Sequence, residues 1–150
     1  MYYRLLYLGF KIYCFLFRPV RMGVRVLMTN DERVWLVRHT YLTGWFMPGG
    51  GLKKWETLEE AARREAWEET GAELGEVSLL GVFSNFGDWK TDHTAVFLCR
   101  DFDLVGKSDA EIAEMRTFPW KELPGDTYPV HLRLLEQFRE GGVRASFGKW

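Results

Sequence analysis

The sequence predicts an α/β protein in which a mixed β-sheet lies between helices, an α/β/α sandwich. Three observations support this prediction. Short runs rich in β-branched residues, separated by turn residues, predict several strands. The stretch 58–70 contains no Gly or Pro and is rich in Ala, Glu and Arg, which favours a helix. A second amphipathic stretch, 129–140, predicts a helix near the end of the chain.

The N-terminal segment, residues 1–19, is apolar and aromatic and predicts a helix over residues 2–17. Its three charges, Arg4, Lys11 and Arg18, are seven residues apart and share one narrow stripe of that helix. The central lysine and a length short of roughly 20 residues disfavour a transmembrane span. We expect the helix to pack on its own domain or on a second copy of the chain, as a homodimer contact. A membrane-interface position, with the basic residues toward the headgroups, is the alternative.

Residues 20–140 form the predicted domain, with six strands. The first two are expected to form a hairpin around Asn30, and the third ends in a glycine-rich loop. The fifth is apolar at nearly every position, so we expect it in the centre of the sheet. The predicted strands are 23–29, 33–39, 45–48, 77–84, 93–101 and 113–118. We expect a polar loop over 85–92 and a frayed tail over 141–150.

The composition is that of a single globular domain of 150 residues, with 47% hydrophobic and 27% charged residues. Its net charge of −1 does not indicate a surface that binds polyanions, so duplex nucleic acid is not an expected partner. The two cysteines, Cys14 and Cys99, lack CxxC spacing and predict reduced, buried thiols in a cytoplasmic protein.

The helix over 58–70 carries the residues that suggest chemistry. Thr57 is its predicted N-cap in a capping box, and Gly71 its predicted stop. Glu65, Glu68 and Glu69 stand at i, i+3 and i+4, so three carboxylates crowd one face. Several carboxylate oxygens in one place are what a hard divalent cation requires. A merely solvated acidic face is the alternative interpretation.

The acidic helix belongs to a longer pattern over residues 50–72, GGLKKWETLEEAARREAWEETGA. Its fixed positions are Gly50, five residues, Glu56, seven residues, Arg64-Glu65, then Glu68-Glu69, one residue and Gly71. This pattern resembles the Nudix box at each polar and glycine position, and the resemblance covers roughly residues 20–140. Ala66 and Ala72 replace the usual bulky aliphatic residues, and no metal or polar position is lost.

The resemblance implies a Nudix hydrolase, in which water attacks a phosphorus of a nucleoside diphosphate linked to another moiety, with Mg²⁺ or Mn²⁺. The implied catalytic residues are Glu65, Glu68 and Arg64, and Glu56 supports the site near the helix start. The implied metal ligands are Gly49 through its carbonyl, Glu65, Glu68, Glu69 and the loop acid Glu111. The general base stays divided between Glu65, Glu68 and a loop acid. Glu114 competes with Glu111 for that position.

The expected substrate contacts are Arg38, His39, Gly50, Gly51 and Trp89. Trp45, Trp55, Phe86 and Trp89 are the aromatic candidates for stacking on a base, although aromatic residues more often belong to a core. Two further functions are weighed: an inactive nucleotide-binding regulator, which the intact box disfavours, and a membrane-associated hydrolase of a lipid-linked diphosphate. No sequence motif identifies the substrate.

Overall fold

The computed structural model describes residues 2–87, 89–141 and 146–150, without the side chains of residues 2–8 and 146. The elements in chain order are α1 (Tyr2–Phe17), β1 (Val20–Met28), β2 (Arg33–His39), α2 (Leu58–Thr70), β3 (Ala72–Leu74), β4 (Val77–Gly87), β5 (Lys90–Cys99), β6 (Phe102–Leu104), β7 (Ile112–Pro119), α3 (Pro129–Arg139) and β8 (Ser146–Lys149).

The main sheet is mixed, as the sequence predicts. Its strand order is β1-β5-β4-β8, with β1 parallel to β5, β5 antiparallel to β4, and β4 parallel to β8. The apolar strand β5 therefore lies between two neighbours, as expected. Two smaller sheets pair β2 with β7 and β3 with β6, both antiparallel.

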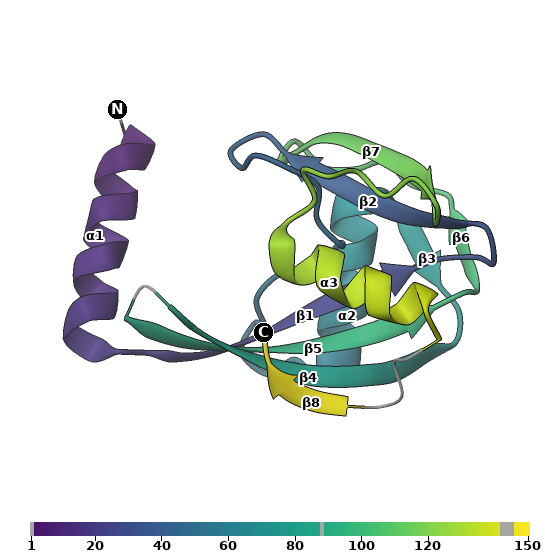
Figure 1. Cartoon of the computed structure of the whole chain (residues 1–150). Helices are drawn as coiled ribbons and strands as arrows, with labels where there is room; N and C mark the ends of the chain where they lie inside the picture. The colour runs from purple at the N-terminus through teal and green to yellow at the C-terminus, as the bar shows by residue number, and fades with distance from the viewer. Residues whose placement is uncertain (1, 88, 142–145) are drawn as a thin grey trace.

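The main sheet buries a different core on each face, because alternate residues of a strand point to opposite sides. One core joins the sheet to α2 through Val24, Val26, Met28, Ala95, Ala61, Ala62 and Ala66. The other joins it to α3 through Leu27, Val96, Leu80, Leu134 and Leu135. Figure 1 shows α2 and α3 on opposite sides of the sheet, so the α/β/α arrangement is confirmed.

Helix α2 has the predicted bounds and ends. The Glu60 N–H donates to Thr57 Oγ1 at 3.2 Å, and the Thr57 N–H donates to Glu60 Oε2 at 2.8 Å, which completes the capping box. Gly71 ends the helix in the left-handed region, with φ of 70°.

Four local predictions are wrong. β1 and β2 meet at one bridge, Thr29 with Val34, and otherwise pair with distant strands instead of forming a hairpin ladder. Residues 45–48 make only isolated bridges, because their backbone hydrogen bonds are divided among β2, β1 and residues 126–131. The polar segment 85–92 is mostly strand, since β4 and β5 continue to a tight connection. Residues 146–149 form β8, because the edge of β4 offers them a partner.

Helix α1 forms over the predicted residues, and its described side chains meet their own domain at the β4–β5 connection and at the start of β1. Figure 1 shows it standing apart, connected through the start of β1. Of its described side chains Cys14 is buried, whereas Phe17 is 69% exposed. Within the described residues, no helix is both long and apolar enough to cross a membrane.

Candidate active site

The glycine loop after residue 48 lies directly against β1. The Val24 N–H donates to the Gly50 carbonyl at 2.9 Å, and the Val26 N–H donates to the Pro48 carbonyl at 2.8 Å. Gly49 has φ of 143°, and a Cβ there would lie 2.2 Å from the Val24 carbonyl oxygen. Glycine is therefore required for the loop to approach the strand this closely.

Arg25 of β1 also binds the segment that leads into this loop. Its Nη1 donates to the carbonyls of Met47, at 3.0 Å, and Gly49, at 2.5 Å. Burial lowers the pKa of this guanidinium, while Glu69 and Glu65 oppose that shift. Sequence reasoning missed Arg25. Its one signal is a cation between apolar residues, with Val24 before it and Val26 after it.

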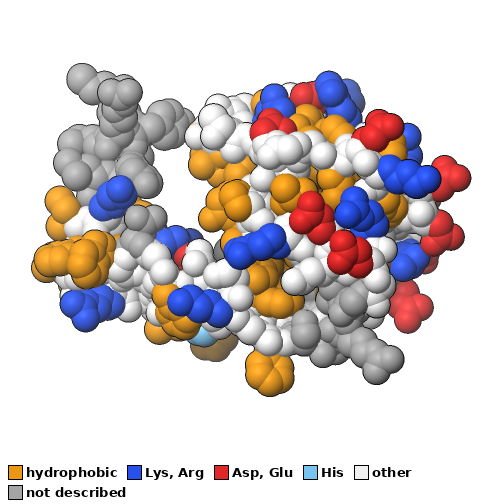
Figure 2. Space-filling model, viewed as in Figure 1, with side chains coloured by type: hydrophobic (Ala, Val, Ile, Leu, Met, Phe, Trp, Pro, Cys, Tyr) orange, Lys and Arg blue, Asp and Glu red, His pale blue; other side chains and the backbone are white. Residues whose placement is uncertain are grey.

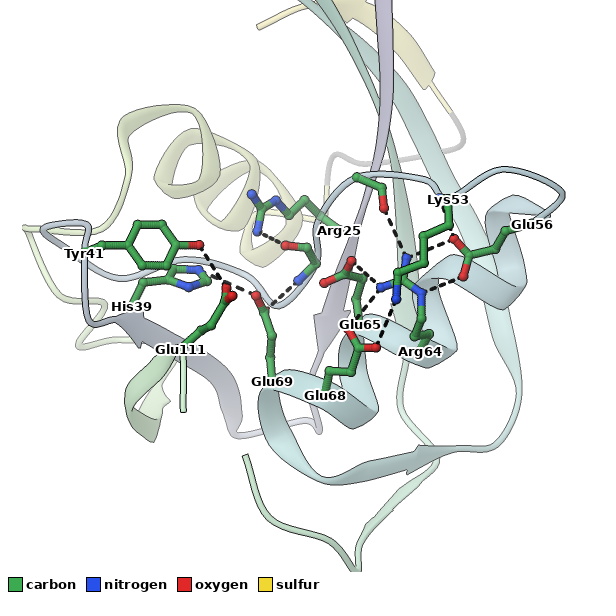
Figure 3. Close-up of polar contacts among 12 residues, drawn as sticks. Arg25, His39, Tyr41, Lys53, Glu56, Arg64, Glu65, Glu68, Glu69 and Glu111 are labelled. Atoms are coloured by element: carbon green, nitrogen blue, oxygen red, sulfur yellow. Dashed lines mark hydrogen bonds and ion pairs between the residues drawn. The ribbon is translucent and has the colours of Figure 1, made fainter. Parts of the chain in front are cut away.

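Arg64 gathers three carboxylates on α2 and the segment before it (Figure 3). It binds Glu56 through Nε at 2.6 Å and Nη2 at 2.9 Å. Its Nη1 donates to Glu65 Oε1 at 2.6 Å and to Glu68 Oε2 at 3.1 Å. Its Nη2 also donates to the Gly51 carbonyl at 3.1 Å, so one planar cation joins the helix to the loop.

The electrostatics of this network favour its ionised form. Hydrogen bonds from Arg64 and from the Lys53 N–H lower the pKa of Glu56 to about 2. The same carboxylates raise the pKa of Arg64, with Glu56 contributing most. Lys53 Nζ adds a second cation, 3.3 Å from Glu68 Oε1. Glu56 thus holds Arg64 from the segment before α2.

Glu69 lies in a different environment from its two neighbours on the helix. Its side chain is buried, and its Oε2 accepts the Gly49 N–H at 2.9 Å. Its Oε1 lies 3.7 Å from His39 Nε2. Burial raises the pKa of Glu69 to about 7, opposed by the Gly49 N–H and Arg25 and reinforced by Glu65. This carboxyl can therefore change protonation near neutral pH.

His39 and Tyr41 complete the side of the site around Glu69. Burial and Arg25 lower the pKa of His39, so its ring is neutral. The Tyr41 hydroxyl donates to Glu111 Oε2 at 3.4 Å, and its pKa is raised by burial, Glu111 and Glu69. Figure 3 shows Glu111 beside Glu69, on the opposite side of the cluster from Arg64.

The sequence model of the family described as NUDIX domain matches residues 19–138. The chain belongs to the Nudix family, and it is a Nudix hydrolase. The chain is 31% identical over 142 residues to diphosphoinositol polyphosphate phosphohydrolase 3-alpha of Mus musculus, covering 89% of this chain and 81% of the relative. It is 30% identical over 127 residues to a MutT-like protein of Streptomyces ambofaciens, covering 83% and 81%.

Solved structures agree on the fold. The crystal structure of a MutT Nudix hydrolase from Burkholderia pseudomallei superposes with a TM-score of 0.70 at 24% identity, covering 79% of this chain and 97% of that one. Nudix hydrolases generally use divalent metals.

The donor set on α2 fits a hard divalent cation, although the side chains are not yet arranged around one. Among the described residues, no group of three His, Cys, Asp or Glu side chains is positioned as a ready metal site. Glu65 and Glu68 turn to Arg64, and Glu69 turns to the Gly49 N–H. Gly50 lacks the Cβ that would meet the Glu65 carboxylate at 2.6 Å, so the carboxylate can occupy the loop. Oxygen donors on one helix face can swing to a cation by side-chain rotation alone.

Two expected substrate contacts are not brought to the acidic cluster. Arg38 Nη2 binds Asp126 at 3.1 Å and its guanidinium stacks 4.5 Å from the Trp45 ring centroid. Trp89 packs edge-on against Phe15 of α1, with ring centroids 5.2 Å apart. The side chain of Arg38 points elsewhere because the pairing of β2 shifts register between Arg38 and His39. Trp89 contacts α1 because the β4–β5 connection extends to that helix (Figure 1).

The remaining candidates separate by burial and pairing. Trp45 is a core residue, 3% exposed, whereas Trp55 in the loop before α2 is 102% exposed. Glu114 pairs with Arg116 at 2.5 Å, while Glu111 lies on the side of Glu69. Trp55 is therefore the stacking candidate next to the acidic helix α2. Glu111 is the loop acid beside the same helix.

Proposed function

We propose that this Nudix hydrolase cleaves the pyrophosphate bond of a nucleoside diphosphate linked to another moiety. The observation that carries the proposal is the position of Glu65, Glu68 and Glu69 against the glycine loop, with Glu69 bonded to the Gly49 N–H. Three carboxylates beside a backbone turn that a side chain would block form a site open to a phosphate chain and a cation.

Glu65, Glu68, Glu69, the Gly49 carbonyl and Glu111 are the groups that would hold Mg²⁺ or Mn²⁺. The ion supplies positive charge to phosphate oxygens and makes a nearby water more acidic. Arg25 occupies one direction on the Gly49 carbonyl, so the second lone pair of that oxygen is the one available.

The protein's own residues orient these groups and move the proton. Arg64 binds Glu65 and Glu68 along α2, which makes it a positioning residue. One of Glu65, Glu68 and Glu111 accepts the proton of the attacking water. The neutral His39 ring packs beside Glu69 without adding a competing positive charge.

The loop before α2 supplies the groups for recognising the rest of the substrate. Trp55 is fully exposed and has φ of 65°, a left-handed conformation that is unfavourable for a bulky residue. Lys53 and Lys54 precede it, so a flat ring and two cations lie beside the acidic helix. A base can stack on Trp55 while the lysines face the phosphates.

Turnover of a substrate panel tests the proposal. Nucleoside diphosphate sugars, dinucleoside polyphosphates, nucleoside triphosphates and a diphosphoinositol polyphosphate are incubated with Mg²⁺ or Mn²⁺, and the products are identified by mass. The last compound is included because the mouse relative is named for it. We expect cleavage of a nucleoside diphosphate derivative that Glu68→Gln abolishes. Tight binding of a nucleotide without product would overturn the hydrolase assignment and favour the regulator.

A further inference from the structure

Helix α1 and the β4–β5 connection form one continuous surface away from the candidate active site. Phe15 packs against Trp89, and the Arg18 guanidinium lies 6.0 Å from the same ring centroid. An open hollow of about 250 Å³ between the two elements is lined by Lys11, Ile12, Phe15 and Trp89. Two elements distant in the sequence thus present a joint face.

This face is apolar and exposed. We define the α1–hairpin surface by six exposed side chains: Ile12, Phe15, Leu16, Phe17, Phe86 and Trp89. Val20, where β1 begins, is 71% exposed beside them. Scattered apolar residues are normal on a protein surface, but several large exposed side chains on two elements that touch through Phe15 and Trp89 indicate an interaction site.

The charges on and around this surface are mostly basic: Asp92 of β5 is paired with Lys90 and Arg21, and α1 carries only basic residues. The first 30 residues carry five basic side chains and no acidic one, in a chain of net charge −1, so residues 31–150 carry −6. Figure 2 shows blue side chains around the orange group at the α1 end, whereas the red side chains gather at the opposite end. The partner of the α1–hairpin surface must therefore be both apolar and anionic.

A second copy of the chain does not meet that description. In a two-fold contact each surface faces itself, so Lys11 and Arg18 would approach their own counterparts. The first 30 residues contain no acid, and Asp92 of β5 is already paired with Lys90 and Arg21. Removing these like charges from water would cost free energy, which would offset the free energy gained from the apolar contact.

A lipid surface with anionic headgroups is both apolar and anionic, as this partner must be. Tryptophan and basic residues flanking an apolar helix are the residue types that anchor proteins at the headgroup region. Helix α1 has 16 residues and is about 24 Å long, short of the ~30 Å hydrocarbon core, so it lies at the interface and does not span it. Trp89 has φ of 62°, an unfavourable conformation that keeps its ring at the turn and outside the core.

We propose that the α1–hairpin surface docks this hydrolase on an anionic lipid bilayer. Leu16, Phe17 and Trp89 enter the interface, and Lys11 and Arg18 lie among the anionic headgroups. The proposal stands apart from the assigned reaction, because none of these contacts involves the acidic cluster.

Vesicle flotation of the full chain tests the docking. We expect binding to vesicles of phosphatidylcholine with 30% phosphatidylserine to exceed binding to phosphatidylcholine alone by roughly tenfold or more, and to fall with salt. The double variant Leu16→Asp/Phe17→Asp should reduce binding at least about tenfold. Lys11→Gln/Arg18→Gln should lower binding to anionic vesicles about tenfold and leave the weak neutral binding unchanged.

A matched control separates docking from general stickiness. Leu104 and Val105 are also exposed, at and just after β6, so Leu104→Asp/Val105→Asp adds the same charges away from α1. This control should bind vesicles like the parent, and circular dichroism should show all variants folded.

Two results would overturn the proposal. The first is equal binding by the α1 and control variants. The second is a dimer in light scattering that Leu16→Asp/Phe17→Asp converts to monomers, with no vesicle binding by the parent; this would assign the surface to a second copy of the chain.

Discussion

Glu69 Oε2 accepts the backbone N–H of Gly49 at 2.9 Å, which ties the last turn of α2 to the loop against β1. The hydrogen bond has two consequences. It fixes the position of α2 relative to the loop, so Glu65, one turn earlier, lies against Gly50. It also favours the ionised form of a buried carboxyl group: burial raises the pKa of Glu69 to about 7, and the Gly49 N–H opposes that shift. The same contact therefore joins α2 to the loop and limits the effect of burial on Glu69.

Replacing an acid on α2 with its amide should abolish hydrolysis and spare the fold. Glu68→Gln and Glu69→Gln each remove one anionic ligand at nearly constant size, and glutamine at 69 can still accept the Gly49 N–H. We expect kcat/KM to fall roughly 10²–10³-fold, equivalent to about 3–4 kcal/mol. Without metal the thermal midpoint should be unchanged or slightly higher, because like-charge repulsion is relieved. Near parental turnover by either variant would refute the ligand assignment.

Removing Arg64 should destabilise the metal-free protein more than the metal-loaded one. In Arg64→Ala the carboxylates of Glu65 and Glu68 lose the cation that they share. The pairs are partly solvated, so we expect a loss of about 1 kcal/mol, a few degrees in Tm, and a smaller deficit when Mg²⁺ neutralises the cluster. Thermal unfolding with and without Mg²⁺ measures this.

The control for that experiment is Arg100→Ala, which removes a pair with the exposed Asp31. Its small effect should not depend on Mg²⁺. A deficit in Arg64→Ala that is equally large with and without Mg²⁺ would show that Arg64 does not share its partners with a metal.

The sequence was sufficient for α2 because the information is local. Helix propensity, the Thr57 and Glu60 capping box and the Gly71 stop lie within the segment, and the helix follows to the residue. Strand pairing depends on distant segments. The partner of β2 is β7, about 80 residues away, so the hairpin predicted from adjacency was wrong. Likewise, the sequence of the tail does not indicate that β8 will pair with the edge of β4.

The same distinction applies to the candidate site. The spacing of Glu65, Glu68 and Glu69 follows from the helix period. Arg25 and Tyr41 reach the site only through tertiary packing, and nothing beside them in the sequence marks them. Trp89 was expected at the substrate because it is an aromatic residue in a predicted loop. Such a residue can equally pack on another element, and only the structure shows which neighbour it has.

Trp55 should contribute to substrate affinity without contributing to stability. Its ring is fully exposed, so Trp55→Ala should leave Tm unchanged. If the ring stacks on a base, the loss of about 1–3 kcal/mol should raise KM roughly 5- to 100-fold for a nucleotide substrate. Trp55→Phe should recover most of the affinity. Equal KM values for the parent and Trp55→Ala would rule out the stacking role.

His131 should make the protein less stable in mild acid. Its ring is buried, its Nδ1 accepts the Met47 N–H at 3.1 Å, and burial lowers its pKa well below 6.5. The unfolded chain binds the proton first, so this contribution is complete above about pH 6.5 and is lost as the pH falls. Between pH 7.5 and 5 it should cost up to about 2 kcal/mol.

The test compares the parent with His131→Gln, whose amide oxygen can still accept the Met47 N–H. Chemical unfolding at the two pH values gives the change in stability for each protein. The change should be smaller in His131→Gln, whatever other groups contribute, because those groups are common to both. The same pH dependence in both proteins would contradict the assignment to His131.

The three consecutive glycines of the loop should respond differently to alanine, although their sequence context is nearly the same. A Cβ at Gly49 would lie 2.2 Å from the Val24 carbonyl, with a positive φ, so Gly49→Ala should destabilise the fold by several kcal/mol. A Cβ at Gly50 would meet the end of the Glu65 side chain at 2.6 Å, which can move aside. Gly50→Ala should therefore fold normally but lose activity, since Glu65 is displaced from the cluster. At Gly51 a Cβ meets nothing within 4 Å, so Gly51→Ala is the matched control and should change neither property much.

Unfolding midpoints and kcat/KM, measured for all three variants, separate the role of the backbone from that of the Glu65 carboxylate. If Gly50→Ala kept full activity, Glu65 could not act from the position in which the loop holds it.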